Sequence, residues 1–226
     1  MPPEGALFVS PHLDDAVLAC GALIAASTRP VVLTLFAGRA PTGQPLTDWD
    51  RAAGFVEGED VVAARREEDR EALALLGAIP AWLDLRDDQY GGAGTPADIA
   101  PILATAVAAR APAALFLPLG LFHSDHLRAS DAGLQVATDS AMGATLHAVH
   151  LYEEPMYRLV DRVRDERLEA LRARGLRLAR RAFDVAADAR ARKREAIACY
   201  RSQLRALGTR NGHADALAPE RYWTLR

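Results

Sequence analysis

Short, almost uninterrupted apolar runs alternate with helical patterns along the first two thirds of this 226-residue chain. Such runs are typical of parallel strands, because crossover helices cover both faces of their sheet. We therefore expect an α/β fold of the Rossmann-like, doubly wound type, with a mostly parallel sheet. The predicted strands are 6–10, 31–36, 81–85, 113–117 and 146–152, and the predicted helices are 16–26, 60–76, 97–110 and 130–141.

The last third of the chain has a different character, with many charged residues and fewer apolar runs. The expected elements are a charged helix over 161–174, a late strand within 176–185 and a helix from 188 to about 207. We predict one domain over 1–226. Its α/β core is expected over 1–152, with a C-terminal strand and helix extension over 153–226 packed on that core.

One long connection, residues 37–58, interrupts the alternation of strands and helices. It is rich in glycine and proline but also holds Trp49 and Phe55. Loops of this length inside a domain are usually functional or disordered, and the two aromatic residues favour an ordered loop. Whether it covers a substrate is left open at this stage.

Composition excludes several classes of protein. Half of the residues are hydrophobic, a quarter are charged and the net charge is −3, so no global field would attract nucleic acid. No run approaches the roughly 18 apolar residues of a membrane span, so no membrane partner is expected. Two cysteines do not make a disulfide framework, which favours a reduced, cytoplasmic protein. Homo-oligomer formation is left open.

Two clusters of histidine and aspartate follow the first and fourth predicted strands. The first cluster lies within Ser-Pro-His-Leu-Asp-Asp at 10–15, and the second is His-Ser-Asp-His at 123–126. In a doubly wound sheet of order 3-2-1-4-5, strands one and four are neighbours, and ligands bind at the switch point between them. The topology therefore brings together two clusters that are far apart in the chain.

Three cluster residues, His12, Asp15 and His126, would supply two imidazoles and one carboxylate. Three protein ligands leave a position open for water, as in catalytic zinc sites, whereas a structural site takes four ligands. Fe²⁺ also suits this ligand set. Each cluster alone has an ordinary structural explanation, since Asp15 would more often be a helix N-cap and a His-x-x-His pair is often solvated.

The other three cluster residues suit catalytic roles. Asp14 is adjacent to a ligand but directed elsewhere, so it is a candidate general base. His123 could donate a hydrogen bond to a developing oxyanion. Asp125 could orient a histidine from outside the ligand set.

At these residues the chain resembles the LmbE-like, or PIG-L, family of zinc-dependent N-acetylglucosaminyl deacetylases. The family pattern Pro-His-x-Asp-Asp stands at 11–15, and His-x-Asp-His stands at 123–126. Residues 65–68, leading to Leu-Gly at 76–77, are similar to the family's Arg-x-x-Glu helix. Residues 193–203 resemble its C-terminal helix.

The resemblance implies a small-molecule substrate, an N-acetyl amino sugar or related glycoconjugate, whose acetyl group is removed by a zinc-activated water. It implies the roles given above for the six cluster residues, with Asp125 supporting His123. It also implies that Arg65 faces the substrate and that Asp87 or Asp88 bonds sugar hydroxyls.

Other classes fit the residues less well. Non-haem iron oxygenases usually carry His-x-Asp on an all-β fold, and a phosphatase with an aspartate nucleophile would need Asp-x-Asp after strand one. A dinucleotide-binding oxidoreductase would need a glycine-rich turn there. Residues 12–15 match none of these patterns. A metal-binding module without catalysis is left open, and it predicts bound metal without hydrolysis.

Overall fold

The computed structural model describes residues 3–92, 94–139, 146–208 and 213–226. Within these ranges seven strands form one sheet in the order β3-β2-β1-β4-β5-β7-β6. The first five strands are parallel, whereas β7 runs antiparallel to both of its neighbours. This confirms the predicted doubly wound, mostly parallel α/β fold. The strands are β1 Ala6–Ser10, β2 Val31–Thr34, β3 Ile79–Trp82, β4 Ala114–Pro118, β5 Ala148–Tyr152, β6 Leu178–Arg181 and β7 Tyr222–Leu225.

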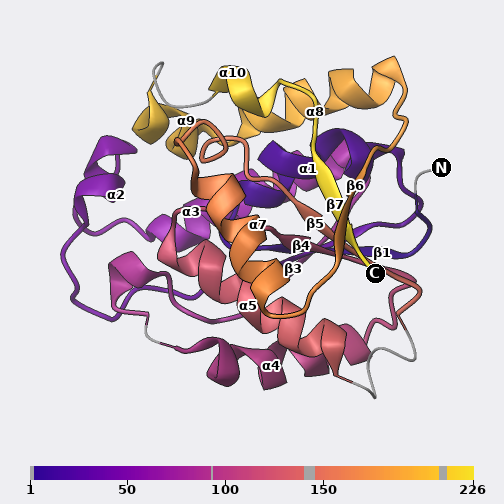
Figure 1. Ribbon diagram of the computed structural model, residues 1–226. Helices are drawn as coiled ribbons and strands as arrows, with labels where there is room; N and C mark the ends of the chain where they lie inside the picture. Colours follow the sequence, from indigo (N-terminus) through magenta and orange to yellow (C-terminus); the bar gives the residue numbers. More distant parts are fainter. Residues whose placement is uncertain (1–2, 93, 140–145, 209–212) are drawn as a thin grey trace.

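Helices cover both faces of the sheet (Figure 1). Helices α1, α3 and α8 pack on one face, and α4, α5 and α7 pack on the other. The helices are α1 Asp15–Ala26, α2 Asp48–Ala52, α3 Val61–Leu76, α4 Pro96–Ala108, α5 Ser124–Thr138, α7 Val163–Ala173, α8 Ala187–Cys199, α9 Arg201–Leu207 and α10 His213–Ala216, with a 3₁₀ turn at Asp88–Tyr90. Among the residues that the structure describes, no helix is both long enough and apolar enough to cross a bilayer.

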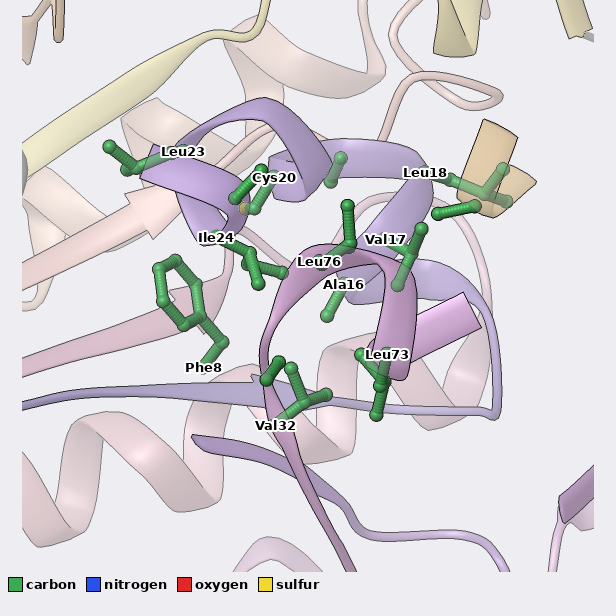
Figure 2. Close-up of a cluster of buried hydrophobic side chains, with 14 of the residues drawn as sticks. Phe8, Ala16, Val17, Leu18, Cys20, Leu23, Ile24, Val32, Leu73 and Leu76 are labelled. Carbon is green, nitrogen blue, oxygen red and sulfur yellow. The ribbon is translucent and has the colours of Figure 1, made fainter. Parts of the chain in front are cut away.

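Strand β1 explains why the apolar runs are continuous. Ala6 and Phe8 face the core under α1 and α3, while Leu7 and Val9 face the core under α4 and α5. Figure 2 shows Phe8 below Leu23 and Ile24 of α1, in the same cluster as Leu73 and Leu76 of α3. Each position of the strand is therefore buried on one face or the other, as a parallel strand at the centre of a sheet requires.

Helix α5 begins earlier than the apolar pattern predicts. We expected it to start at residue 130, but it starts at Ser124, with His123 as its N-cap. Nδ1 of His123 accepts a hydrogen bond from the backbone N–H of Asp125, which takes the place of the usual serine or aspartate cap. The described helix ends at Thr138, and the predicted end at 141 lies outside the described residues.

The C-terminal third contributes more to the sheet than expected. The late strand is shorter, at Leu178–Arg181, and it pairs with β7, which the sequence pattern did not predict. The predicted helix from 188 to about 207 is two helices, separated at Tyr200. The Tyr200 hydroxyl donates to buried Asp69 of α3, which fixes the break against the core.

The third strand is Ile79–Trp82 rather than 81–85. Its register on β2 includes Pro80, a residue that lacks an N–H. Proline is tolerated because β3 is the edge strand and needs no donor on its outer side. The shift does not alter the edge of the sheet where the two clusters meet.

Candidate metal centre and active site

The turn from β1 to α1 holds the first cluster in a fixed shape. The Ser10 hydroxyl donates to the carbonyl of His12 at 2.6 Å and accepts from the N–H of Ala16 at 3.0 Å. The backbone N–H of His12 donates to Oδ2 of Asp15 at 2.9 Å. These local bonds turn His12 and Asp15 toward the same side of the sheet edge.

The turn from β4 to α5 holds the second cluster. Gly120 has φ +84°, and a Cβ there would lie only 2.7 Å from Cβ of Ser130, so glycine is required. The N–H groups of Gly120 and Leu121 both donate to Oε1 of Glu154, at 2.8 and 3.1 Å. Glu154 therefore anchors the loop that carries His123 and the start of α5.

His12, Asp15 and His126 meet around one point. Oδ2 of Asp15 lies 3.1 Å from Nδ1 of His12 and 3.2 Å from Nε2 of His126. Bond lengths of about 2.0–2.1 Å around a tetrahedral zinc ion imply ligand separations of about 3.3 Å. The nitrogen and oxygen donors and their spacing therefore fit a zinc ion, and the three residues form a candidate metal set.

A carboxylate holds the far side of each imidazole in this set. Nδ1 of His126 lies 3.3 Å from Oε1 of Glu154, and Nε2 of His12 lies 3.0 Å from Oδ2 of Asp125. Such outer partners fix the tautomer and orientation of ligating histidines. They leave Nδ1 of His12 and Nε2 of His126 as the nitrogens that face Asp15.

The electrostatics of the set favour a cation. Burial opposes protonation of His126, but the charges of Asp15 and Glu154 outweigh it and raise the pKa of His126 to about 9. Burial also opposes protonation of His12, and the nearby carboxylates, Asp87 first, raise its pKa well above the ordinary value. The surrounding negative charge that holds these protons would equally stabilise a metal ion.

Asp125 occupies a different place from the one that the resemblance implied. Its carboxylate bonds His12, while only its backbone N–H bonds His123. Oδ2 also accepts from the N–H of Asp88, and Oδ1 accepts from Arg128 at 2.5 Å. Burial alone would raise the pKa of Asp125, but the hydrogen bond with His12 and these neighbours hold it at about 2.

A second group of possible ligands, His12, His123 and Asp125, also satisfies the spacing for a metal. It would have to use the Nε2 face of His12, where the Asp125 carboxylate already bonds the ring. It would also compete with Arg128 for Asp125. The set with Asp15 and His126 lacks these competing partners and is the more buried, so we favour it.

Asp14 is buried beside the metal set and lines the adjoining cavity. Burial, and then the charge of Asp15, raise its pKa to about 7. A carboxylate with a pKa near neutrality is suited to accept a proton and to return it. Asp14 lies next to Asp15 in the chain but is not part of the candidate metal set.

His123 presents a hydrogen-bond donor to the same cavity. Because Nδ1 accepts from the backbone of Asp125 at 3.2 Å, the neutral ring carries its proton on Nε2. Burial, and then the charges on His12 and His126, lower the pKa of His123 and favour that neutral form. The ring can therefore donate from Nε2 to an oxygen in the cavity.

The cavity has a volume of about 430 Å³ and opens over the metal set. Most of its lining residues are histidine, aspartate or glutamine, and Trp49, Met156, Tyr157 and Leu207 supply the apolar and aromatic part. Trp49 enters from the 37–58 loop, and its indole N–H donates to Gln203 of α9 at 3.0 Å. Besides the metal set, the lining residues are Asp14, Trp49, Asp87, Asp88, Gln89, His123, Met156, Tyr157, Gln203 and Leu207.

The three candidate substrate-binding residues, Arg65, Asp87 and Asp88, differ in their position relative to the cavity. Asp87 lines the cavity, 3.8 Å from Nε2 of His12, and Asp88 lines it while its carboxylate bonds Ser124. Arg65 does not line the cavity. It is 4% exposed and lies behind the wall, with its guanidinium 3.0 Å from Asp50. The structure therefore places Arg65 where it braces the 37–58 loop.

Glu154 is the site residue that sequence reasoning missed. It is 1% exposed and follows β5, the strand beside β4. The available signal was the pair of acidic residues at 153–154, directly after an apolar strand whose carboxyl end meets the same sheet edge. Strand-end carboxylates at that edge are candidates for a ligand site.

These features define an α/β protein with a candidate single-metal centre at the carboxyl edge of a parallel sheet. The family model for GlcNAc-PI de-N-acetylase, PIG-L, matches residues 7–137, which include both clusters. The chain belongs to the PIG-L family. Comparison with curated proteins gave no significant match.

Solved structures share the whole fold. The zinc-inhibited form of teicoplanin deacetylase superposes with a TM-score of 0.81 at 22% identity, covering 98% of this chain and 97% of the other. The deacetylase of the A40926 pseudoaglycone has a TM-score of 0.76 at 27% identity, covering 97% and 95%. The 4-carboxy-2-hydroxymuconate hydratase of Pseudomonas putida reaches 0.57 at 18% identity, covering 99% and 95%.

Proposed function

We propose that this protein is a zinc-dependent N-deacetylase that removes the acetyl group from an N-acetyl amino sugar or a related glycoconjugate. One observation carries the proposal. Asp14, with its pKa raised to about 7, and the donor nitrogen of His123 share a cavity with a two-histidine, one-carboxylate set. Family membership and the fold support it.

The chain's own residues divide the chemistry among them. A zinc ion held by His12, Asp15 and His126 would supply a Lewis acid and lower the pKa of bound water. Asp14 accepts a proton from the attacking water as the water adds to the amide carbon. His123 donates from Nε2 to the amide oxygen as negative charge develops there.

Asp14 then completes the reaction. Protonated Asp14 returns its proton to the amide nitrogen, so the carbon–nitrogen bond breaks and the amine leaves uncharged. Acetate is the second product. Asp125 and Glu154 keep the two ligating imidazoles in their tautomers throughout, because each bonds the ring nitrogen that faces away from Asp15.

The volume and polarity of the cavity suit an amino sugar. A volume of about 430 Å³ falls within the range of small-molecule sites. Asp87 and Gln89 offer oxygen and nitrogen atoms that can form hydrogen bonds with sugar hydroxyl groups. The flat indole of Trp49 offers a surface that suits the apolar face of a pyranose ring. The acidic wall also suits the ammonium group of the product.

The fold alone does not decide the reaction, since a hydratase shares it. The test is therefore chemical. Purified protein should be incubated with N-acetylglucosamine, its methyl glycoside and N-acetylgalactosamine, and the free amine and acetate should be measured together. We expect equal amounts of both products from at least one sugar, released at least about 10²-fold more slowly by the Asp14→Asn variant. Bound metal without amine release from any N-acyl sugar would instead indicate a module that only binds metal.

A further inference from the structure

A second cavity lies between α8, the middle of α1 and the segment that leads into β7. Its volume is about 330 Å³, within the range of small-molecule sites. Helix α8 lies alongside α1 (Figure 1), and residues of α1, α8 and β7 line the space. Among the residues described, this cavity shares none of its lining with the cavity over the candidate metal set. The proposed deacetylase reaction therefore gives it no role.

The only lysine of the chain, Lys193, lines this second cavity. At every other position where the chain carries a lysine or an arginine, the residue is arginine. Lys193 is 4% exposed, and a Cβ on Gly21 of α1 would lie 2.7 Å from its Cγ. Glycine at position 21 therefore makes room for the lysine stem, and the packing of α8 on α1 is built around this side chain.

Glu220 holds the ammonium group of Lys193 in the cavity wall. Its Oε1 accepts from Nζ of Lys193 and from the N–H of Ala22, both at 2.8 Å. Its Oε2 accepts from the N–H of Leu23 at 3.2 Å and from the Tyr222 hydroxyl at 2.6 Å. The Glu220 carboxylate is thus fully hydrogen-bonded.

The ammonium group of Lys193 is not fully hydrogen-bonded in the same way. An ammonium group has three N–H donors, and within the described residues Glu220 is the one acceptor for Lys193. Unpaired donors on a buried charge cost free energy. Two N–H donors of a buried cation therefore remain for an acceptor in the cavity.

Two exposed arginines of α8 add positive charge to the cavity. Arg190 and Arg194 lie four residues apart on one face of the helix. Arg190 donates to the carbonyl of Val185 at 2.6 Å, and Arg194 has no carboxylate partner in the described part of the chain. With Lys193, three basic residues line the cavity against one acidic residue, Glu220. The lining therefore favours an anion.

The rest of the lining is mostly apolar. Phe183 meets the ring of Tyr222 edge-on, with 5.1 Å between ring centroids. Val185 and Pro219 also line the cavity, and Leu217 beside them is 54% exposed. An apolar chain or ring in the cavity would remove these surfaces from water.

We propose that this cavity binds a small monocarboxylic acid with an apolar chain or ring. Its carboxylate accepts from Lys193 and Arg194 in charge-assisted hydrogen bonds, and its apolar part packs near Phe183. The Glu220 carboxylate next to Nζ favours a single negative charge, because a dianion such as phosphate would be repelled there. The inference does not depend on the proposed deacetylase function.

The single lysine provides a direct test. Protein that is isotope-labelled at the lysine Cε gives one lysine side-chain signal in an NMR spectrum. We expect octanoate to shift this signal saturably, with a Kd below about 1 mM. Acetate, which lacks the apolar chain, and octanol, which lacks the charge, should each bind at least about fivefold more weakly.

A pair of arginine variants separates the cavity from the general protein surface. Arg194→Gln removes a cation from the cavity but leaves Lys193 and Glu220 in place, so octanoate should bind at least about threefold more weakly. Arg172→Gln makes the same change of charge at an exposed position of α7, on the other face of the sheet, and should bind octanoate like the wild type.

Three results would overturn the proposal. The first is a lysine signal that octanoate leaves unshifted. The second is equal binding of octanoate and octanol, which would assign the cavity to uncharged apolar molecules. The third is equal weakening in both arginine variants, which would show that octanoate responds only to the overall charge of the protein.

Discussion

Nε2 of His12 lies 3.0 Å from Oδ2 of Asp125, so a residue of the second cluster holds the ring of a proposed metal ligand in the first. This bond links the turn after β1 to the first turn of α5. Asp125→Ala should therefore weaken zinc binding by about 10- to 100-fold, the usual effect of losing such an outer partner. Competition with a chelator of known affinity measures the change. Ser124→Ala, one residue earlier on the same turn, is the control and should bind zinc like the wild type.

Substitutions of Asp14 and of Asp15 should differ in their effects on zinc content and on turnover. Asp14→Asn keeps the size of the side chain but removes its basicity, so we expect near-normal zinc content with turnover lowered by at least about 10². Asp15→Asn should lose zinc first, because Oδ2 of Asp15 faces both imidazoles. Elemental analysis after dialysis, paired with initial rates, distinguishes the two. The reverse pattern would show that the roles were assigned to the wrong residues.

Substitution of His123 should lower turnover without changing the zinc content. Asparagine at an N-cap preserves helix α5, but it does not reach the position of Nε2. In His123→Asn we expect turnover to fall by about 10²–10³, as for other lost oxyanion donors, with unchanged zinc content and thermal stability. Unchanged turnover in a folded, zinc-loaded variant would limit His123 to its capping role.

Arg65 should affect stability more than substrate binding. It is paired with Asp50 in a buried position, and its NH1 donates to the hydroxyl of Tyr90. Arg65→Gln leaves the Asp50 carboxylate without its cation, which costs about 3–5 kcal/mol in buried pairs. Urea unfolding of the metal-loaded protein measures this loss. A stable variant whose KM alone is raised would instead place Arg65 in contact with substrate, as the resemblance implied.

The sheet order and the meeting of the two clusters could be predicted because both depend on local pattern. Continuous apolar runs mark buried parallel strands, and the strand order then fixes which strand ends are neighbours. Side-chain partnerships within the site could not be predicted in the same way. Whether the carboxylate of Asp125 turns toward His12 or His123 depends on the cap that starts α5, which is a tertiary detail.

The C-terminal region was harder to predict because its short strands are only partly buried. Arg180 and Arg181 occupy half of β6, the edge strand, so the sequence pattern placed a strand within 176–185 without fixing its bounds. Strand β7 has only four residues, and its pairing with β5 follows from packing rather than from periodicity. The break at Tyr200 is similar, since a bond to Asp69 across the core overrides a continuous helical pattern.

Zinc titration of the metal-free protein tests the central claim most directly. Protein stripped with a chelator should release no acetate from the best N-acetyl sugar. Activity should then return in proportion to added zinc and level off at about one equivalent, because three ligands with one open position define a single catalytic site. His126→Ala, which lacks one of the three ligands, should stay inactive over the same range. Full deacetylase activity in the stripped protein, with no response to added zinc, would contradict the account.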